Sequence, residues 1–173
     1  VVDLDGATTV EDLFNRIKLA DPDVVTRISA DGERLEIVTR LSGAEFSIGE
    51  NGGTNAAGLG IRTMDGSTRL SELNRGFGVQ FDNEGRLSVT RRDGTSVEID
   101  LTGSQTIQDV LDRVNAVDPG VLVASLNSVG NGISLTDSSG TGPLTVEATV
   151  LANDLKIAGS DDGGSTGVLS GGD

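Results

Sequence analysis

Cysteine and histidine are both absent from the 173 residues of the sequence. Without them there is no thiol nucleophile, no imidazole acid–base pair and no zinc site built on thiolate or imidazole ligands. A disulfide framework is excluded as well, so an extracellular location would have to be tolerated without one. The composition thus removes several common catalytic and metal-binding chemistries before any motif is considered.

Aromatic residues are almost as scarce, with four phenylalanines, no tryptophan and no tyrosine. Any core must therefore be built from Val, Leu and Ile, and each half of the chain can bury only a small one. No apolar run approaches the ~20 residues that cross a bilayer, and no signal peptide is visible. The chain starts at Val1, directly in a strand-like segment, so we expect an excised fragment of a longer protein.

Basic residues are in the minority, with 13 Lys and Arg against 27 Asp and Glu and a net charge of −14. Nucleic acid is disfavoured as a partner because phosphate binding needs a basic footprint. An anionic membrane surface is disfavoured for the same reason. We interpret the acidity as a device that keeps an exposed protein soluble.

The feature that is present is a duplication. An amphipathic helix is predicted from Val10 to Ile17, with Thr9 as its cap, and a second from Ile107 to Val117, with Thr106 as its cap. An acidic residue three positions after each cap fits a capping box. Both helices lead to Asp-Pro, at residues 21–22 and 118–119, which stops a helix.

Strands are predicted around each helix. They cover residues 1–5, 24–28, 34–38 and 45–48 in the first copy, and 121–126, 132–136 and 144–148 in the second. Residues 49–60 are predicted as a loop, and a helical turn at 68–74 precedes three further strands, around 77–81, 87–89 and 97–101. The Asp-Gly pairs at 31–32 and 93–94 are expected in hairpin turns.

The two copies stay in register over most of their length. With an offset of 97, Val2, Leu4, Gly6, Asp12 and Arg16 match Ile99, Leu101, Gly103, Asp109 and Arg113. With small shifts in the offset, Phe46, Ile48, Leu59 and Ile61 match Leu144, Val146, Leu155 and Ile157. Capping, apolar and turn positions agree together, which indicates tandem units, each an antiparallel sheet with one packed helix.

The fold class that follows is α+β. We expect a first repeat unit at residues 1–63, a second, complete unit at 64–157, and a flexible tail rich in Gly, Ser and Asp at 158–173. The first copy has no counterpart of residues 68–97, which again predicts a truncated start.

Candidate chemical motifs are weak. The run at residues 3–6 has the wrong Gly position for a calcium loop, and the Asp-Asp-Gly-Gly run at 161–164 has no supporting ligands. Gly58-Leu59-Gly60 does not join a strand to a helix in a parallel unit, so it is not a dinucleotide fingerprint. Arg91-Arg92 is predicted to compensate nearby acidity. We expect no catalytic, cofactor-binding or metal-binding residues and no cofactor.

Several of these residues carry a resemblance to a known family. The pattern runs through Gly6-Ala7-Thr8-Thr9, a helix with Val10, Asp12, Leu13 and Ile17, and a hairpin with Val25, Ile28, Asp31-Gly32, Leu35 and Ile37. It ends with Phe46, Ile48 and Ala56-Ala57-Gly58-Leu59-Gly60-Ile61. It resembles the flagellin hook IN motif of bacterial flagellins and hook-associated proteins, over nearly all of residues 1–157. In copy two, the ending Asn153-Asp154-Leu155-Lys156-Ile157 departs from the Gly-Leu-Gly-Ile form.

The resemblance implies a structural, non-enzymatic, surface-exposed region of a flagellar hook-associated protein of the hook–filament junction type. Such a protein would be exported and extracellular, and its partners would be other flagellar subunits, contacted through segments outside this fragment. The fragment itself is expected to be monomeric, with no nucleic-acid or membrane partner. Alternatives are an outer domain of flagellin or of a filament cap protein, or an adhesin-like binding module that uses loops such as residues 49–60.

Overall fold

The computed structural model describes residues 1–42, 46–161 and 168–170. The fold is α+β, with small antiparallel sheets and packed helices. The chain divides into two compact units, Val1–Thr63 (unit 1) and Met64–Asp173 (unit 2). None of the helices in the described part of the chain combines the length and apolarity that a bilayer crossing requires.

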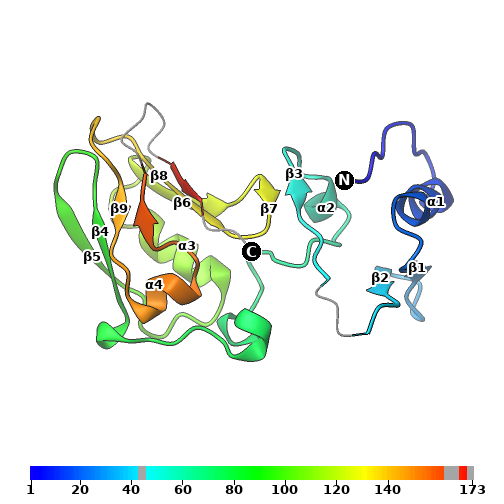
Figure 1. Cartoon of the computed structure of the whole chain (residues 1–173), viewed down its shortest axis with the longest axis horizontal. Helices are drawn as coiled ribbons and strands as arrows, with labels where there is room; N and C mark the ends of the chain where they lie inside the picture. Colours follow the sequence, from blue (N-terminus) through cyan, green and yellow to red (C-terminus); the bar gives the residue numbers. More distant parts are fainter. Residues whose placement is uncertain (43–45, 162–167, 171–173) are drawn as a thin grey trace. The chain divides into compact units, whose positions relative to one another are not determined.

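Unit 1 is built around one helix and one hairpin (Figure 1). The capped helix and the Asp-Gly hairpin predicted from the sequence are both confirmed. Leu13, Ile17 and Val24 form its buried cluster, because apolar residues three and four apart share one helix face. Its elements are α1 (Val10–Ala20), β1 (Val24–Ile28), β2 (Leu35–Thr39), β3 (Glu50–Asn51) and α2 (Asn55–Gly58).

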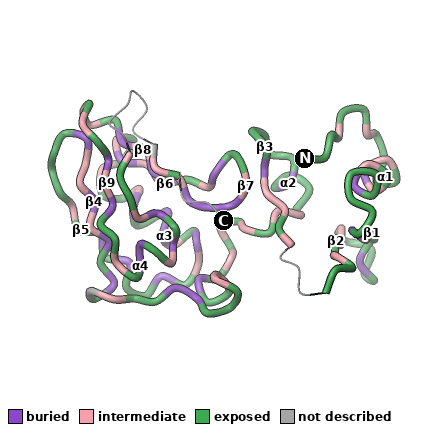
Figure 2. The backbone as a smooth tube through the Cα atoms, viewed as in Figure 1, coloured by how far each residue is buried: buried purple, intermediate pink, exposed green. Residues whose placement is uncertain are grey.

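Unit 2 holds two larger sheets and most of the buried residues, which are purple in Figure 2. Its strands are β4 (Arg86–Thr90), β5 (Ser96–Asp100), β6 (Leu122–Leu126), β7 (Val129–Gly130), β8 (Ile133–Asp137), β9 (Thr145–Val146), β10 (Gly159–Ser160) and β11 (Val168–Ser170). Its helices are α3 (Ile107–Asn115) and α4 (Val150–Asp154), with short 3-10 turns at Leu70–Glu72, Asn74–Gly76 and Asn83–Gly85.

The sheets of unit 2 are antiparallel, in the orders β10-β9-β4-β5 and β11-β8-β6. Strand β4 is central in the first, with Leu87 opposite Ile99 in β5 and Val89 opposite Val146 in β9. Helix α3 contacts β6 and β5, and α4 contacts β4. Because the inward residues of these elements alternate with polar ones, a single aliphatic core forms between them.

Three predicted strands are wrong. Residues 1–5 and 46–48 form no strand, although Ile48 exchanges hydrogen bonds with Thr63, at 2.9 Å from the Thr63 amide to the Ile48 carbonyl. Residues 77–81 are irregular as well, since the amides of Gly78 and Val79 donate to the carbonyls of Leu73 and Leu70 instead of to a ladder. A strand exists only where its backbone groups find a strand partner.

Two further predictions need correction. The expected loop at residues 49–60 contains β3 and α2. The expected flexible tail at 158–173 instead contributes β10, paired with β9, and β11, paired with β8, because the outer edges of those strands offer unpaired backbone groups. The expectation for residues 162–167 and 171–173, like that for 43–45, lies outside the described residues.

Truncating Leu111 tests the placement of the core. Leu111 is 6% exposed on α3, and we expect Leu111→Ala to destabilise unit 2 by about 2–5 kcal/mol through lost contacts and a residual cavity. Urea unfolding followed by circular dichroism measures the change. The control is Leu19→Ala, at an 87% exposed position, which should shift stability by less than about 0.5 kcal/mol. Equal midpoints for the two variants would contradict the assignment of the α3 face.

Candidate functional site

The start of each helix is the geometry that the two units share most closely. In unit 2, the Asp109 amide donates to Thr106 Oγ1 at 3.2 Å, and Asp109 Oδ2 accepts from the Thr106 and Gln105 amides at 2.9 and 2.8 Å. This capping box satisfies amides that a helix leaves unpaired at its start.

Unit 1 repeats the capping box bond for bond. The Asp12 amide donates to Thr9 Oγ1 at 3.1 Å, and Asp12 Oδ2 accepts from the Thr9 and Thr8 amides at 3.0 and 3.1 Å. The Thr9 hydroxyl is the main cause that lowers the pKa of Asp12, followed by the bonds from Thr8. For Asp109 the Gln105 and Thr106 amides lower the pKa. Both carboxylates thus hold their charge where the helix dipole favours it.

An arginine then ties each helix to the segment before it. Arg113 donates through one guanidinium nitrogen to the Asp100 carbonyl at 2.8 Å, and Arg16 donates likewise to the Asp3 carbonyl at 3.2 Å. Between them the chain turns through a glycine with φ of +81° at Gly103 and +76° at Gly6, a region that favours glycine. The duplication therefore preserves a contact that fixes helix direction.

The ends of the two copies also agree, although their sequences do not. The Ile61 amide donates to the Ala56 carbonyl at 2.9 Å, and the Ile157 amide donates to the Ala152 carbonyl at 3.0 Å. The residue before each isoleucine is left-handed: Gly60 has φ of +66° and Lys156 has φ of +59°. The departure of the second copy from the Gly-Leu-Gly-Ile form leaves the backbone turn intact.

Carboxylates also cap the short helices. Glu50, buried in β3, accepts from the Ala56 and Ala57 amides at 3.3 and 2.7 Å. Asp82 accepts from the Val150 and Leu151 amides at 2.8 and 3.0 Å, and these bonds lower its pKa. An adhesin-like module would use the segment 49–60 as a ligand loop. The buried Glu50 carboxylate of this segment instead accepts hydrogen bonds from the amides of α2.

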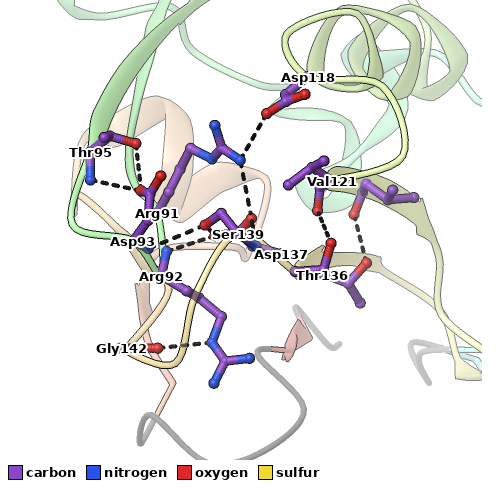
Figure 3. A network of polar contacts seen from close by, with 12 residues as sticks. Arg91, Arg92, Asp93, Thr95, Asp118, Val121, Thr136, Asp137, Ser139 and Gly142 are labelled. Atoms are coloured by element: carbon purple, nitrogen blue, oxygen red, sulfur yellow. Dashed lines mark hydrogen bonds and ion pairs between the residues drawn. The ribbon is translucent and has the colours of Figure 1, made fainter.

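A charge network with a buried carboxylate lies in unit 2, where a hairpin turn meets the end of β8 (Figure 3). The Arg91 side chain is 11% exposed and pairs with Asp118 at 2.9 Å and with Asp137 at 3.6 Å. The Asp137 side chain is fully inaccessible. Arg91 thus balances two carboxylates that come from the loop before β6 and from the end of β8.

Asp137 is held by several donors besides Arg91. Its Oδ2 accepts from the Arg92 amide at 2.6 Å and from the Ser139 hydroxyl at 2.7 Å, while the Arg92 guanidinium donates to the Gly142 carbonyl at 2.8 Å. Burial alone would raise the pKa of Asp137, but these hydrogen bonds and the Arg91 charge together hold that pKa below its ordinary value of 3.8. The network connects three loops, and both oxygens of the Asp137 carboxylate have partners within it.

Other acidic positions have local structural roles. Asp3 accepts from the Asp5 amide at 2.9 Å, and Asp161 Oδ1 accepts from the Leu144 amide at 2.7 Å; residues 162–164 of its run lie outside the described part. Across residues 1–42, 46–161 and 168–170, no three His, Cys, Asp or Glu side chains come together in a way that could hold a metal ion. A shallow open depression in unit 1 lies over Gly6, Asp12 and Arg16, which the capping box and the arginine contact already use.

Sequence reasoning found the capping boxes and missed the buried network. The Asp118-Pro119 pair was visible as a helix stop, and Arg91 as a compensating charge, but nothing local joined them to Asp137. The signal that could have found it is the combination of an adjacent Arg pair before one hairpin and an Asp that ends an alternating apolar strand.

Replacing Lys156 by glycine should stabilise unit 2. A side chain at φ of +59° is strained, and glycine removes that strain at a smaller entropic cost. We expect Lys156→Gly to raise the free energy of unfolding by roughly 0.5–1 kcal/mol. Chemical denaturation measures it, with Lys156→Ala as the control that shortens the exposed side chain but keeps the Cβ. An equal gain in both variants would show that the strain is not the cause.

Acid should weaken unit 2 through Asp137. The pKa of Asp137 is lowered in the folded state, so its stabilising contribution is fully present above about pH 4 and is lost as the pH falls through the folded pKa. Asp137→Ala leaves Arg91 with Asp118 alone and removes the acceptor of the Arg92 amide and the Ser139 hydroxyl, which should cost about 3–5 kcal/mol at pH 7. Unfolding midpoints measured from pH 7 to 2 should converge for the two proteins in acid.

The control for that series is Asp93→Ala, which removes an exposed carboxylate of the same hairpin turn, bonded to Thr95. Its difference from the parent protein at pH 7 should be much smaller. A difference between Asp137→Ala and the parent that stays constant down to pH 2 would contradict the role given to the Asp137 charge.

Comparison with known proteins adds no relative. No protein-family model matches the chain, and neither the curated proteins nor the solved structures include a match.

Proposed function

We propose that this chain is a non-catalytic, surface-exposed structural region of a bacterial flagellar hook-associated protein. The observation that carries the proposal is that the residues matched between the two units make structural contacts. Thr9 and Asp12, like Thr106 and Asp109, cap a helix, while Arg16 and Arg113 bond the backbone of the preceding segment. Duplication of such contacts repeats a scaffold.

The buried charges support the same function. Glu50 and Asp137, the buried carboxylates of the part that the structure describes, accept hydrogen bonds from helix and loop amides, and Arg91 is paired with two acidic groups. A general acid or base needs to reach a proton on a substrate. Glu50 and Asp137 instead accept hydrogen bonds from backbone amides inside the fold, as expected of a structural domain.

The composition fits an exported, solvent-facing location. The net charge of −14 resists self-association, and the absence of cysteine leaves no thiol to oxidise outside the cell. In this proposal, the protein assembles with other flagellar subunits through segments outside residues 1–173, and the two units face the medium.

Immunogold electron microscopy tests the proposal. An antibody raised against this chain is applied to intact, flagellated cells of the source organism that produce the full-length protein. We expect labelling confined to the flagellum, concentrated near the junction of hook and filament. The control is the same antibody after absorption with the purified chain, which should abolish the label.

Two outcomes would overturn the proposal. Label found only in the cytoplasm of sectioned cells would exclude an exported component. Label spread over the cell surface and away from flagella would favour the adhesin-like alternative, which a glycan array would then examine.

A further inference from the structure

Unit 1 exposes apolar side chains that unit 2 buries at matching positions. Val2 is 38% exposed while Ile99, its counterpart, is 3% exposed, and Leu59 is 37% exposed while Leu155 is 4% exposed. The same holds for the positions that are half-buried in unit 1 and fully buried in unit 2, namely Leu4 against Leu101, Phe46 against Leu144, Ile48 against Val146 and Ile61 against Ile157.

One strand accounts for much of this burial in unit 2. Strand β4 lies between β5 and β9, and its Leu87 and Val89 are completely buried. Leu87 stands opposite Ile99, and Val89 stands opposite Val146. A single insertion between two neighbouring strands thus covers their apolar residues and pairs their backbone groups at once.

The segments that would flank such a strand are present in unit 1. Leu4 and Phe46 both pack against the cluster of Leu13 and Ile17, so the two segments lie on the same small core. Neither residues 1–5 nor residues 46–48 form a strand, and no described residue of unit 1 supplies a counterpart of β4. Among the described residues of unit 1, no strand occupies the position that β4 takes in unit 2.

We propose that unit 1 is a strand acceptor, completed by the β4–β5-type hairpin of a further repeat unit of this kind. Its occupant is an antiparallel strand with two aliphatic residues separated by one polar residue, as in Leu87-Ser88-Val89. That strand lies between residues 1–4 and 46–48. This inference rests on the comparison of the two units and is independent of the flagellar proposal.

A strand fits between residues 1–4 and 46–48 better than a helix does. A docked helix satisfies its own backbone and would offer no ladder partner to the flanking segments. A strand pairs with both segments and presents one apolar face every second residue. The hairpin segment 64–97 also carries five acidic and five basic residues, so its arrival adds no net charge to an acidic unit.

A graft onto the full chain tests the proposal. A copy of residues 64–97 is placed directly before Val1, so that Val97 of the copy is followed by Val1 in the place of Glu98. Hydrogen–deuterium exchange then reports on residues 1–5 and 46–48. We expect exchange in both segments to slow by roughly tenfold or more relative to the parent chain at the amides that face the inserted strand, because these become part of a ladder. The Ile48 amide already donates to Thr63 and is not one of them.

The matched control is the same graft with Leu87→Asp and Val89→Asp in the copied segment only. Unit 2 keeps its own hairpin in every protein and serves as the internal reference for folding. The control should exchange like the parent chain in residues 1–5 and 46–48, since charged side chains cannot enter the aliphatic position.

Two results would overturn the inference. Unchanged exchange in the unmodified graft would show that unit 1 does not accept the hairpin. Protection of the same residues in the parent chain, appearing with concentration together with a dimer in ultracentrifugation, would show that a second unit 1 is the occupant instead. Neither result bears on where the protein is located, which the labelling experiment decides separately.

Discussion

Each unit depends on burying one face of a short helix against antiparallel strands without the help of large aromatic side chains. Aliphatic residues contribute about 25 cal/mol for each Å² removed from water, so a small core is stable only when it is covered on every side. Unit 2 achieves this with two sheets, and its helix α3 buries Ile107, Val110, Leu111 and Val114. Unit 1 covers Leu13 and Ile17 and leaves its flanking residues half open.

Carboxylates serve as structural parts in this acidic protein. Asp12 and Asp109 accept hydrogen bonds from the amides of the helix cap and of the residue before it, and Asp82 accepts from the first two amides of α4. The Thr9 side chain is the main cause that lowers the pKa of Asp12, and backbone amides lower the pKa of Asp82 and Asp109. Much of the acidity that looks like solvation from the sequence therefore directs the backbone. The charge that is good for solubility is, at these positions, also the charge that starts the helices.

The elements predicted correctly were those whose signal is local. A cap, its partner three residues later and an apolar stripe specify α1 and α3, and Asp31-Gly32 and Asp93-Gly94 mark hairpin turns. The strand predicted at residues 1–5 was wrong because alternation of apolar and polar residues cannot show whether a partner strand is present. The Arg91, Asp118 and Asp137 network was hidden for a related reason: its members meet only after β4, β6 and β8 are in place.

Strand β11 covers a sheet edge in unit 2, whereas a strand edge in unit 1 is protected in another way. By pairing with β8, Val168–Ser170 occupies an edge that would otherwise offer a row of free backbone groups to another molecule. In unit 1, β2 has only β1 as its partner among the described residues, and it carries Glu36 as its second residue. A charge on a short edge strand discourages intermolecular pairing, so the two units guard against aggregation by different means, one by covering the edge and the other by charging it.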